Sequence, residues 1–117
     1  MKKIVIVVDN AIIAMEIQKN LEIEGYLVPL ICRTLKEVLK VQFEMDLIIL
    51  DLDYISMEKI REVDVPVIFL SSLAESELES HEISTLEITF DFLYKPFTKE
   101  ELLYKTHQIL SPNIKNS

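Results

Sequence analysis

Four polar side chains that can take part in chemistry stand directly after short apolar runs in this sequence. They are Asp9, Asp51, Ser71 and Lys95. The apolar runs before them cover residues 4–8, 47–50, 67–70 and 92–94. Near-continuous apolar runs of this length are typical of parallel strands buried on both faces, and ligands of such sheets bind beyond the carboxyl ends of the strands. We therefore expect two carboxylates, a hydroxyl and an ammonium to meet in one crevice.

This set of side chains suits phosphoryl transfer. Two carboxylates can hold Mg²⁺, which keeps most of its waters and takes one or two protein carboxylates together with phosphate oxygens. A lysine and a serine can bind the other oxygens of a phosphoryl group, while one carboxylate acts as the nucleophile and becomes an aspartyl phosphate. The residues thus predict a Mg²⁺-dependent reaction on an aspartate.

The order Asp, Asp, Ser, Lys-Pro along alternating strands resembles the receiver domain of two-component response regulators. The resemblance covers nearly the whole chain and extends to Pro66 before the run at 67–70 and to Phe97 after Lys-Pro. It implies that Asp51, in the run DLIILDL, is the nucleophile and phosphoacceptor. It also implies that Lys95 pairs with a phosphoryl oxygen and that the bond from Lys95 to the following proline is cis.

Further site residues follow from the same resemblance. Asp9 matches a metal-binding acid, although Asp9 or Asn10 can equally serve as the N-cap of the following helix. Receivers usually have two adjacent acids here, whereas this chain has Val8 before Asp9. Losing one carboxylate weakens a site held mainly by charge, and Asp53 is a candidate to compensate, because residues two apart on an extended segment point the same way. A solvated loop acid is an equally simple interpretation of Asp53. The backbone carbonyl of Asp53 also matches a metal ligand of the family.

Two residues match the switch of receivers. Ser71 matches the hydroxyl residue that moves to hydrogen-bond the phosphoryl group, and Phe92 matches the aromatic side chain that follows this movement. For Phe92, ordinary packing at the edge of the core is an equally simple interpretation. The segment after Asp51 lacks the Pro and Gly residues common in the family.

The predicted fold is α/β, a flavodoxin-like doubly wound five-stranded parallel sheet in the order 2-1-3-4-5 with helices on both faces. Pro29 lies in the second strand, at 26–31, and proline cannot donate to a strand ladder, so this strand belongs at a sheet edge, as the order requires. Capping boxes predict helices from Thr34 to about Glu44 and from Thr98 to about Leu110. The third helix, at about 56–62, is shortened to about two turns, and a fourth is expected within 75–86.

Length and composition predict one domain over residues 1–111 and a loose tail at 112–117. No apolar run approaches the roughly 18 residues needed to span a bilayer, and the apolar part of the start is too short for a signal peptide. We therefore expect a cytoplasmic protein. Cys32 is the only cysteine, which excludes an internal disulfide, and it is interpreted as a small buried side chain after the second strand.

The formal net charge of −8 is concentrated in one segment. Residues 62–94 contain eight acidic residues and no lysine or arginine. Such a surface repels phosphate backbones and anionic lipids, so we expect binding neither to nucleic acid nor to a membrane. Two interpretations stay open: a solvated face that aids solubility, or a docking face for a basic partner.

Two functions are compatible with these residues. The first is a stand-alone receiver, monomeric or weakly dimeric, that takes a phosphoryl group from a histidine kinase or phosphotransfer protein and then binds a downstream protein partner. The alternative is a pseudo-receiver that acts as a phosphorylation-independent interaction module, which Val8 favours. A nucleotide or cofactor binder is disfavoured, because the single glycine, Gly25, ends a helix instead of forming a phosphate-binding loop.

Overall fold

The computed structural model describes residues 1–40, 44–52, 60–72 and 86–111. Its strands are β1 (Lys3–Val7), β2 (Leu27–Cys32), β3 (Leu47–Asp51), β4 (Val67–Ser71) and β5 (Phe90–Tyr94). Its helices are α1 (Ala11–Ile23), α2 (Leu35–Leu39) and α6 (Lys99–Leu110). The strands begin and end within about two residues of the predicted apolar runs.

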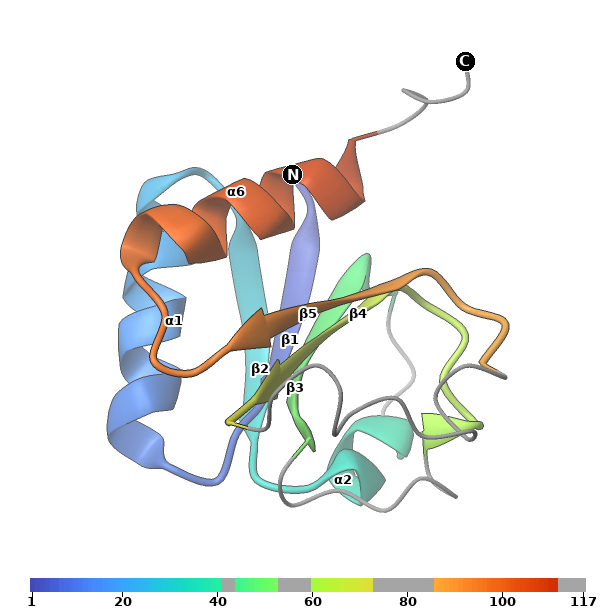
Figure 1. Ribbon diagram of the computed structural model, residues 1–117. Helices are drawn as coiled ribbons and strands as arrows, with labels where there is room; N and C mark the ends of the chain where they lie inside the picture. Colours follow the sequence, from blue (N-terminus) through green and yellow to red (C-terminus); the bar gives the residue numbers. More distant parts are fainter. Residues whose placement is uncertain (41–43, 53–59, 73–85, 112–117) are drawn as a thin grey trace.

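The five described strands form one parallel sheet in the order β2-β1-β3-β4-β5. This order confirms the predicted doubly wound fold. Figure 1 shows α1 and α6 on one face of the sheet and α2 on the other. Because all the strands are parallel, their carboxyl ends lie at the same edge of the sheet.

The core has two halves, one on each face of the sheet. One half packs α1 and α6 against the sheet, and the other packs α2 against it. Every residue of β3 and β4 is buried, which explains why these strands are apolar without alternation. Strand β1 contributes Ile4 and Ile6 to the first half and Val5 and Val7 to the second. The carboxyl ends of the central strands are therefore held on a rigid base.

The ends of α1 and α6 follow from local sequence signals. Asn10 is the N-cap of α1, and its Oδ1 accepts hydrogen bonds from two backbone N–H groups of the first turn. Gly25 follows the end of α1 with φ of 97°, a left-handed conformation that favours glycine. Thr98 and Glu101 form the predicted capping box of α6.

Helix α2 is shorter than predicted. It ends at Leu39, and Glu44, where the helix was expected to end, is not helical. The chain is tied to the sheet two residues after Glu44: the backbone N–H of Asp46 donates to the carbonyl oxygen of Lys3 at 2.8 Å, and its Oδ2 accepts from the backbone N–H of Lys3 at 2.8 Å. Glu44 therefore lies in the approach to β3 and is not the end of a helix.

The predicted capping box of α2 is also only half formed. Thr34 is the N-cap and its side chain accepts from the backbone N–H of Glu37. The carboxylate of Glu37, however, accepts from the backbone N–H of Arg33 at 3.1 Å instead of returning to the cap residue. This bond ties Arg33 to the start of α2.

Some predictions fall on segments outside the described residues. These are most of the third helix, the fourth helix up to residue 85, and the tail at 112–117. Of the ends that are described, Ile60 is helical and Leu86 is not. The domain over residues 1–111 stays a prediction. None of the helices in the described ranges is long and apolar enough to cross a membrane.

Strand β2 lies at an edge of the sheet, as Pro29 predicted. Between the pairs Lys3–Leu27 and Val5–Leu30, β2 contains one residue more than β1, so the register shifts at this point. The irregularity coincides with the proline, which has no N–H to give to the ladder. The regular pairing resumes before Cys32, which pairs with Val7.

Candidate functional site

Three of the four polar side chains are positioned by adjacent strand ends. Asp51 is the last residue of β3, Ser71 is the last residue of β4, and Lys95 directly follows β5. Ser71 pairs with Tyr94 in the sheet, and the backbone N–H of Lys95 donates to the carbonyl oxygen of Ser71 at 2.8 Å. The backbone thus fixes Lys95 beside the end of β4.

The structure brings Lys95 into direct contact with Asp51. The Nζ of Lys95 lies 3.1 Å from Oδ1 and 3.0 Å from Oδ2 of Asp51. The side chain of Asp51 is 6 % exposed and that of Lys95 is 23 % exposed. A buried carboxylate is costly unless it is paired and hydrogen-bonded, and the ammonium supplies both the charge and the donors. The Lys95–Pro96 peptide bond is cis, as the resemblance implied.

Ser71 is fully buried at the end of β4. Its strand pairs directly with β3, and Asp51 itself pairs with Leu70. A hydroxyl, a carboxylate and an ammonium therefore come from three consecutive strands at one edge of the sheet. Such a group can bind an anion only if the ammonium gives part of its contact with Asp51 to the incoming oxygens.

Asp9 makes a contact that the sequence analysis did not anticipate, while its role as a metal ligand stays a prediction. Because Asn10 caps α1, the carboxylate of Asp9 is not used for the cap. Its Oδ1 instead accepts a hydrogen bond from Nε of Arg33 at 3.0 Å. Arg33 follows β2, the neighbour of β1 in the sheet. Sequence reasoning missed Arg33, although its position directly after the predicted edge strand was the available signal.

The neighbouring acid that receivers usually have is replaced by a core residue. Val8 is 2 % exposed and packs with Ile4 and Ile6 in the half of the core that faces α1. Its side chain is therefore part of the hydrophobic packing. Asp53, the predicted compensating ligand, lies outside the described residues.

The described residues contain no group of three His, Cys, Asp or Glu side chains able to hold a metal ion. They do offer two carboxylates, Asp9 and Asp51, which follow adjacent strands at the same sheet edge. Mg²⁺ binds oxygen ligands, keeps several waters and uses one or two protein carboxylates in phosphate-binding sites. The donor set thus fits a largely hydrated Mg²⁺.

Comparison with known proteins shows which fold this arrangement of strands and side chains belongs to. No family model matches the chain. A two-component response regulator from Clostridium difficile superposes with a TM-score of 0.79 over 94% of this chain and 96% of that one, at 20% identity. The chemotaxis response regulator CheY4 of Vibrio cholerae superposes with a TM-score of 0.78 over 94% and 99%, at 24% identity. The chain has the response regulator receiver fold.

A curated relative agrees with this receiver fold. The chain is 36% identical to the uncharacterized transcriptional regulatory protein YbdJ of Bacillus subtilis (strain 168), over 92% of the chain and 50% of the relative. The chain thus spans about half the length of this relative.

Four aromatic residues of β4 and β5 form a cluster of ring contacts: Phe69, Phe90, Phe92 and Tyr94. Phe92 lies 5.6 Å from Phe69 and 5.8 Å from Phe90 between ring centroids, and it stacks on Tyr94 at 6.0 Å with an interplanar angle of 13°. These contacts give Phe92 a packing role. Its role as a switch stays a prediction.

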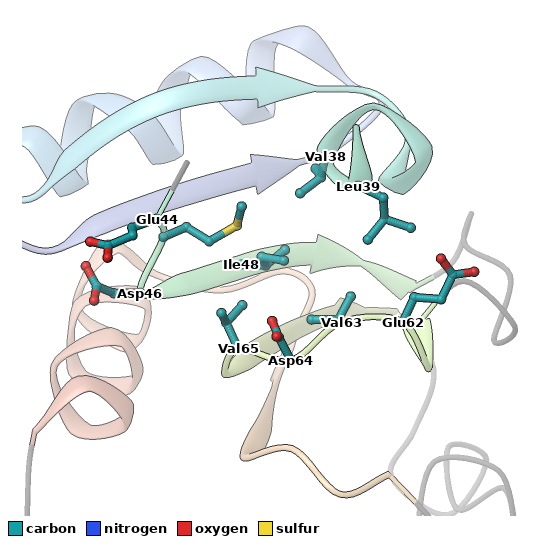
Figure 2. Close-up of a pocket in the computed structure, with 10 residues that line it drawn as sticks. Val38, Leu39, Glu44, Asp46, Ile48, Glu62, Val63, Asp64 and Val65 are labelled. Atoms are coloured by element: carbon teal, nitrogen blue, oxygen red, sulfur yellow. The ribbon is translucent and has the colours of Figure 1, made fainter. Parts of the chain in front are cut away.

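A cavity of about 550 Å³ lies beside α2 (Figure 2). It opens between α2, the start of β3 and residues 62–65, and its lining mixes apolar side chains such as Val38 and Ile48 with acids such as Asp46 and Asp64. Neither Asp51 nor Lys95 lines it. We therefore assign it no part in the chemistry of the strand ends.

Cys32, at the end of β2, is a buried ionisable side chain with a raised pKa. Burial raises the pKa of the thiol to about 11, and the neighbouring carboxylate of Glu37 adds to the rise, while a backbone hydrogen bond from Thr34 opposes it. The thiolate is the reactive form of cysteine. Cys32 is therefore protonated and unreactive at neutral pH.

We expect native Cys32 to react with a disulfide reagent at about pH 8 at least about ten-fold more slowly than in the unfolded chain, whose thiol has a pKa near 8.5. Since the unfolded state loses its proton first, stability is unaffected below about pH 8.5 and falls as the pH rises to about 11. Labelling rates of the native and the unfolded protein, measured against pH, check the expected difference in thiol reactivity. Glu37→Gln is expected to lower the pKa of Cys32 in the native protein, but only by the part that Glu37 contributes. Equal labelling rates in the native and unfolded protein would contradict the raised pKa of Cys32.

Proposed function

We propose that this chain accepts a single phosphoryl group on Asp51 from a histidine kinase or phosphotransfer protein, in a Mg²⁺-dependent reaction. The phosphorylated form then binds a downstream protein partner with changed affinity. The observation that carries the proposal is the buried Asp51 carboxylate, held through both oxygens by the ammonium of Lys95.

The step itself is a displacement at phosphorus. One Asp51 oxygen forms a bond to phosphorus while the bond from phosphorus to the donor's nitrogen or oxygen breaks, and its electron pair leaves with the donor. Lys95 moves part of its contact from Asp51 to a phosphoryl oxygen, and the Ser71 hydroxyl donates to another. Asp9 and Asp51 would hold Mg²⁺, which supplies further neutralisation of the phosphoryl charge when bound.

The burial of Asp51 also supports the proposal. A carboxylate that is 6 % exposed has little water around it, so its attacking oxygen needs little desolvation before it meets phosphorus. Lys95 contacts this carboxylate, and 23 % of its side chain is exposed, so its charge is accessible to an arriving donor. The ammonium can therefore guide an anionic phosphoryl group to the carboxylate.

A second candidate is the pseudo-receiver, which binds partners without phosphorylation. The contact between Asp9 and Arg33 and the apolar packing of Val8 favour it, since both reduce the negative charge available to a metal ion. The expectations that the chain binds no nucleic acid, acts as a monomer or weak homodimer and works in the cytoplasm stay predictions. The relative YbdJ is described as a transcriptional regulatory protein. That description applies to a protein about twice as long as this chain.

Intact-mass measurement after incubation with Mg²⁺ and a small phosphodonor, or with a phosphorylated kinase, tests the proposal. We expect a mass increase of one phosphoryl group that disappears when a chelator replaces Mg²⁺. Absence of the adduct with every donor would favour the pseudo-receiver.

A further inference from the structure

Arg33 and Asp9 each follow a backbone segment that is held in place by the pairing of β1 with β2. Val7 pairs with Cys32 across β1 and β2, and the backbone N–H of Val8 donates to the carbonyl oxygen of Cys32 at 3.0 Å. Asp9 and Arg33 each come next after this hydrogen-bonded pair. The following residues are anchored as well, because Asn10 caps α1 and Thr34 caps α2.

The two side chains are accessible although their backbones are fixed. The side chain of Arg33 is 75 % exposed and that of Asp9 is 49 % exposed. Exposed ion pairs of this kind are weak, because water and salt screen both charges. A divalent cation can therefore reach Asp9 and displace the guanidinium without unfolding any element.

We propose that Arg33 competes with Mg²⁺ for the Asp9 carboxylate and so lowers the metal affinity of the site; this inference rests on the metal binding in the proposed function. The guanidinium occupies Oδ1 of Asp9, one of the oxygens that a metal would use. It is always charged, so it also repels an approaching cation.

The charges at the strand ends make this competition effective. Asp51 faces Lys95 and Asp9 faces Arg33, so the two negative and two positive charges of these four side chains cancel. These four side chains together therefore carry no net charge before any metal arrives. A Mg²⁺ ion that takes Oδ1 of Asp9 replaces the contact of Arg33, which is exposed and therefore easier to displace than the buried contact of Lys95.

The decisive variant is Arg33→Gln. In a Mg²⁺ titration of the unphosphorylated full chain followed by NMR amide shifts at about 0.15 M salt, we expect its dissociation constant to be about two- to five-fold lower than that of wild type. Lys36→Gln is the matched control. Lys36 is exposed on α2, three residues after Arg33, and the described residues show it in no ion pair. Its substitution changes the net charge of the protein by the same amount as Arg33→Gln, and we expect little change in Mg²⁺ affinity.

Arg33→Lys adds a second control, because it keeps the positive charge and is expected to keep most of the effect. Equal dissociation constants for wild type and Arg33→Gln would overturn the inference. An equal increase in Mg²⁺ affinity for Arg33→Gln and Lys36→Gln would also overturn the inference, since it would reflect the change in net charge alone. The phosphoryl adduct is measured separately: its absence, together with a gain for Arg33→Gln alone, would reject the proposed function and retain the role of Arg33.

Discussion

Asp51→Asn is expected to abolish the phosphoryl adduct completely. An amide of nearly the same shape cannot supply the oxygen nucleophile, and among the described residues Asp51 is the carboxylate in contact with Lys95 at the ends of the central strands. The measurement is intact mass within minutes of adding Mg²⁺ and phosphodonor. Circular dichroism of the variant verifies that the fold is retained.

Asp91→Asn is the matched control for this experiment. Asp91 is held by Lys105 through both carboxylate oxygens at 3.2 Å, an arrangement like that of Asp51 and Lys95. The pair is more exposed, however, and joins β5 to α6 away from the ends of β3 and β4. We expect this variant to form the adduct normally. An adduct of undiminished yield on Asp51→Asn would mean that another side chain is the acceptor.

Phe69→Ala is expected to lower the free energy of unfolding by about 3–5 kcal/mol. Phe69 is fully buried in the middle of β4, and its ring contacts those of Phe90 and Phe92 at centroid distances of 5.9 and 5.6 Å. Removing it leaves a cavity that the rigid sheet cannot close. Because domains of this size are stable by about 5–15 kcal/mol, the loss is a large fraction of the total.

Urea denaturation followed by far-ultraviolet circular dichroism measures this loss. Phe92→Ala serves as the control, because Phe92 is only partly buried and its removal is expected to cost clearly less. Phe69 packs in the core and contributes no polar group to the strand-end site, so any protein that remains folded is expected to retain the adduct reaction. An unchanged midpoint for Phe69→Ala would contradict the assignment of Phe69 to the centre of this half of the core.

The sheet was predictable because its signals are local. Apolar runs mark the buried strands, Pro29 assigns β2 to an edge, and Gly25 marks the end of α1. Each depends on a few neighbouring residues and on rules that hold in any parallel sheet. The contact of Lys95 with Asp51 followed from the same rules, because strand order alone places their backbones at one edge, while the chemical roles of both residues stay predictions.

The contact between Asp9 and Arg33 was harder to predict. It joins residues 24 positions apart, and it depends on Asn10 taking the cap of α1 so that the Asp9 carboxylate is available. The length of α2 was mispredicted for a similar reason. The capping signal at Thr34 is local, whereas Asp46, two residues after Glu44, is held by hydrogen bonds to Lys3, which belongs to a strand far away in the sequence.

The proline in β2 bears on how copies of the chain behave at high concentration. An edge strand presents unpaired N–H and C=O groups that can pair with the edge of another molecule and start aggregation. In β2, Pro29 carries no N–H, and the shift in register between Leu27 and Leu30 disturbs the spacing of the neighbouring backbone groups. A second strand would find no regular ladder to extend along β2. The irregular proline segment thus makes this edge of the sheet a poor place for another copy of the chain to pair.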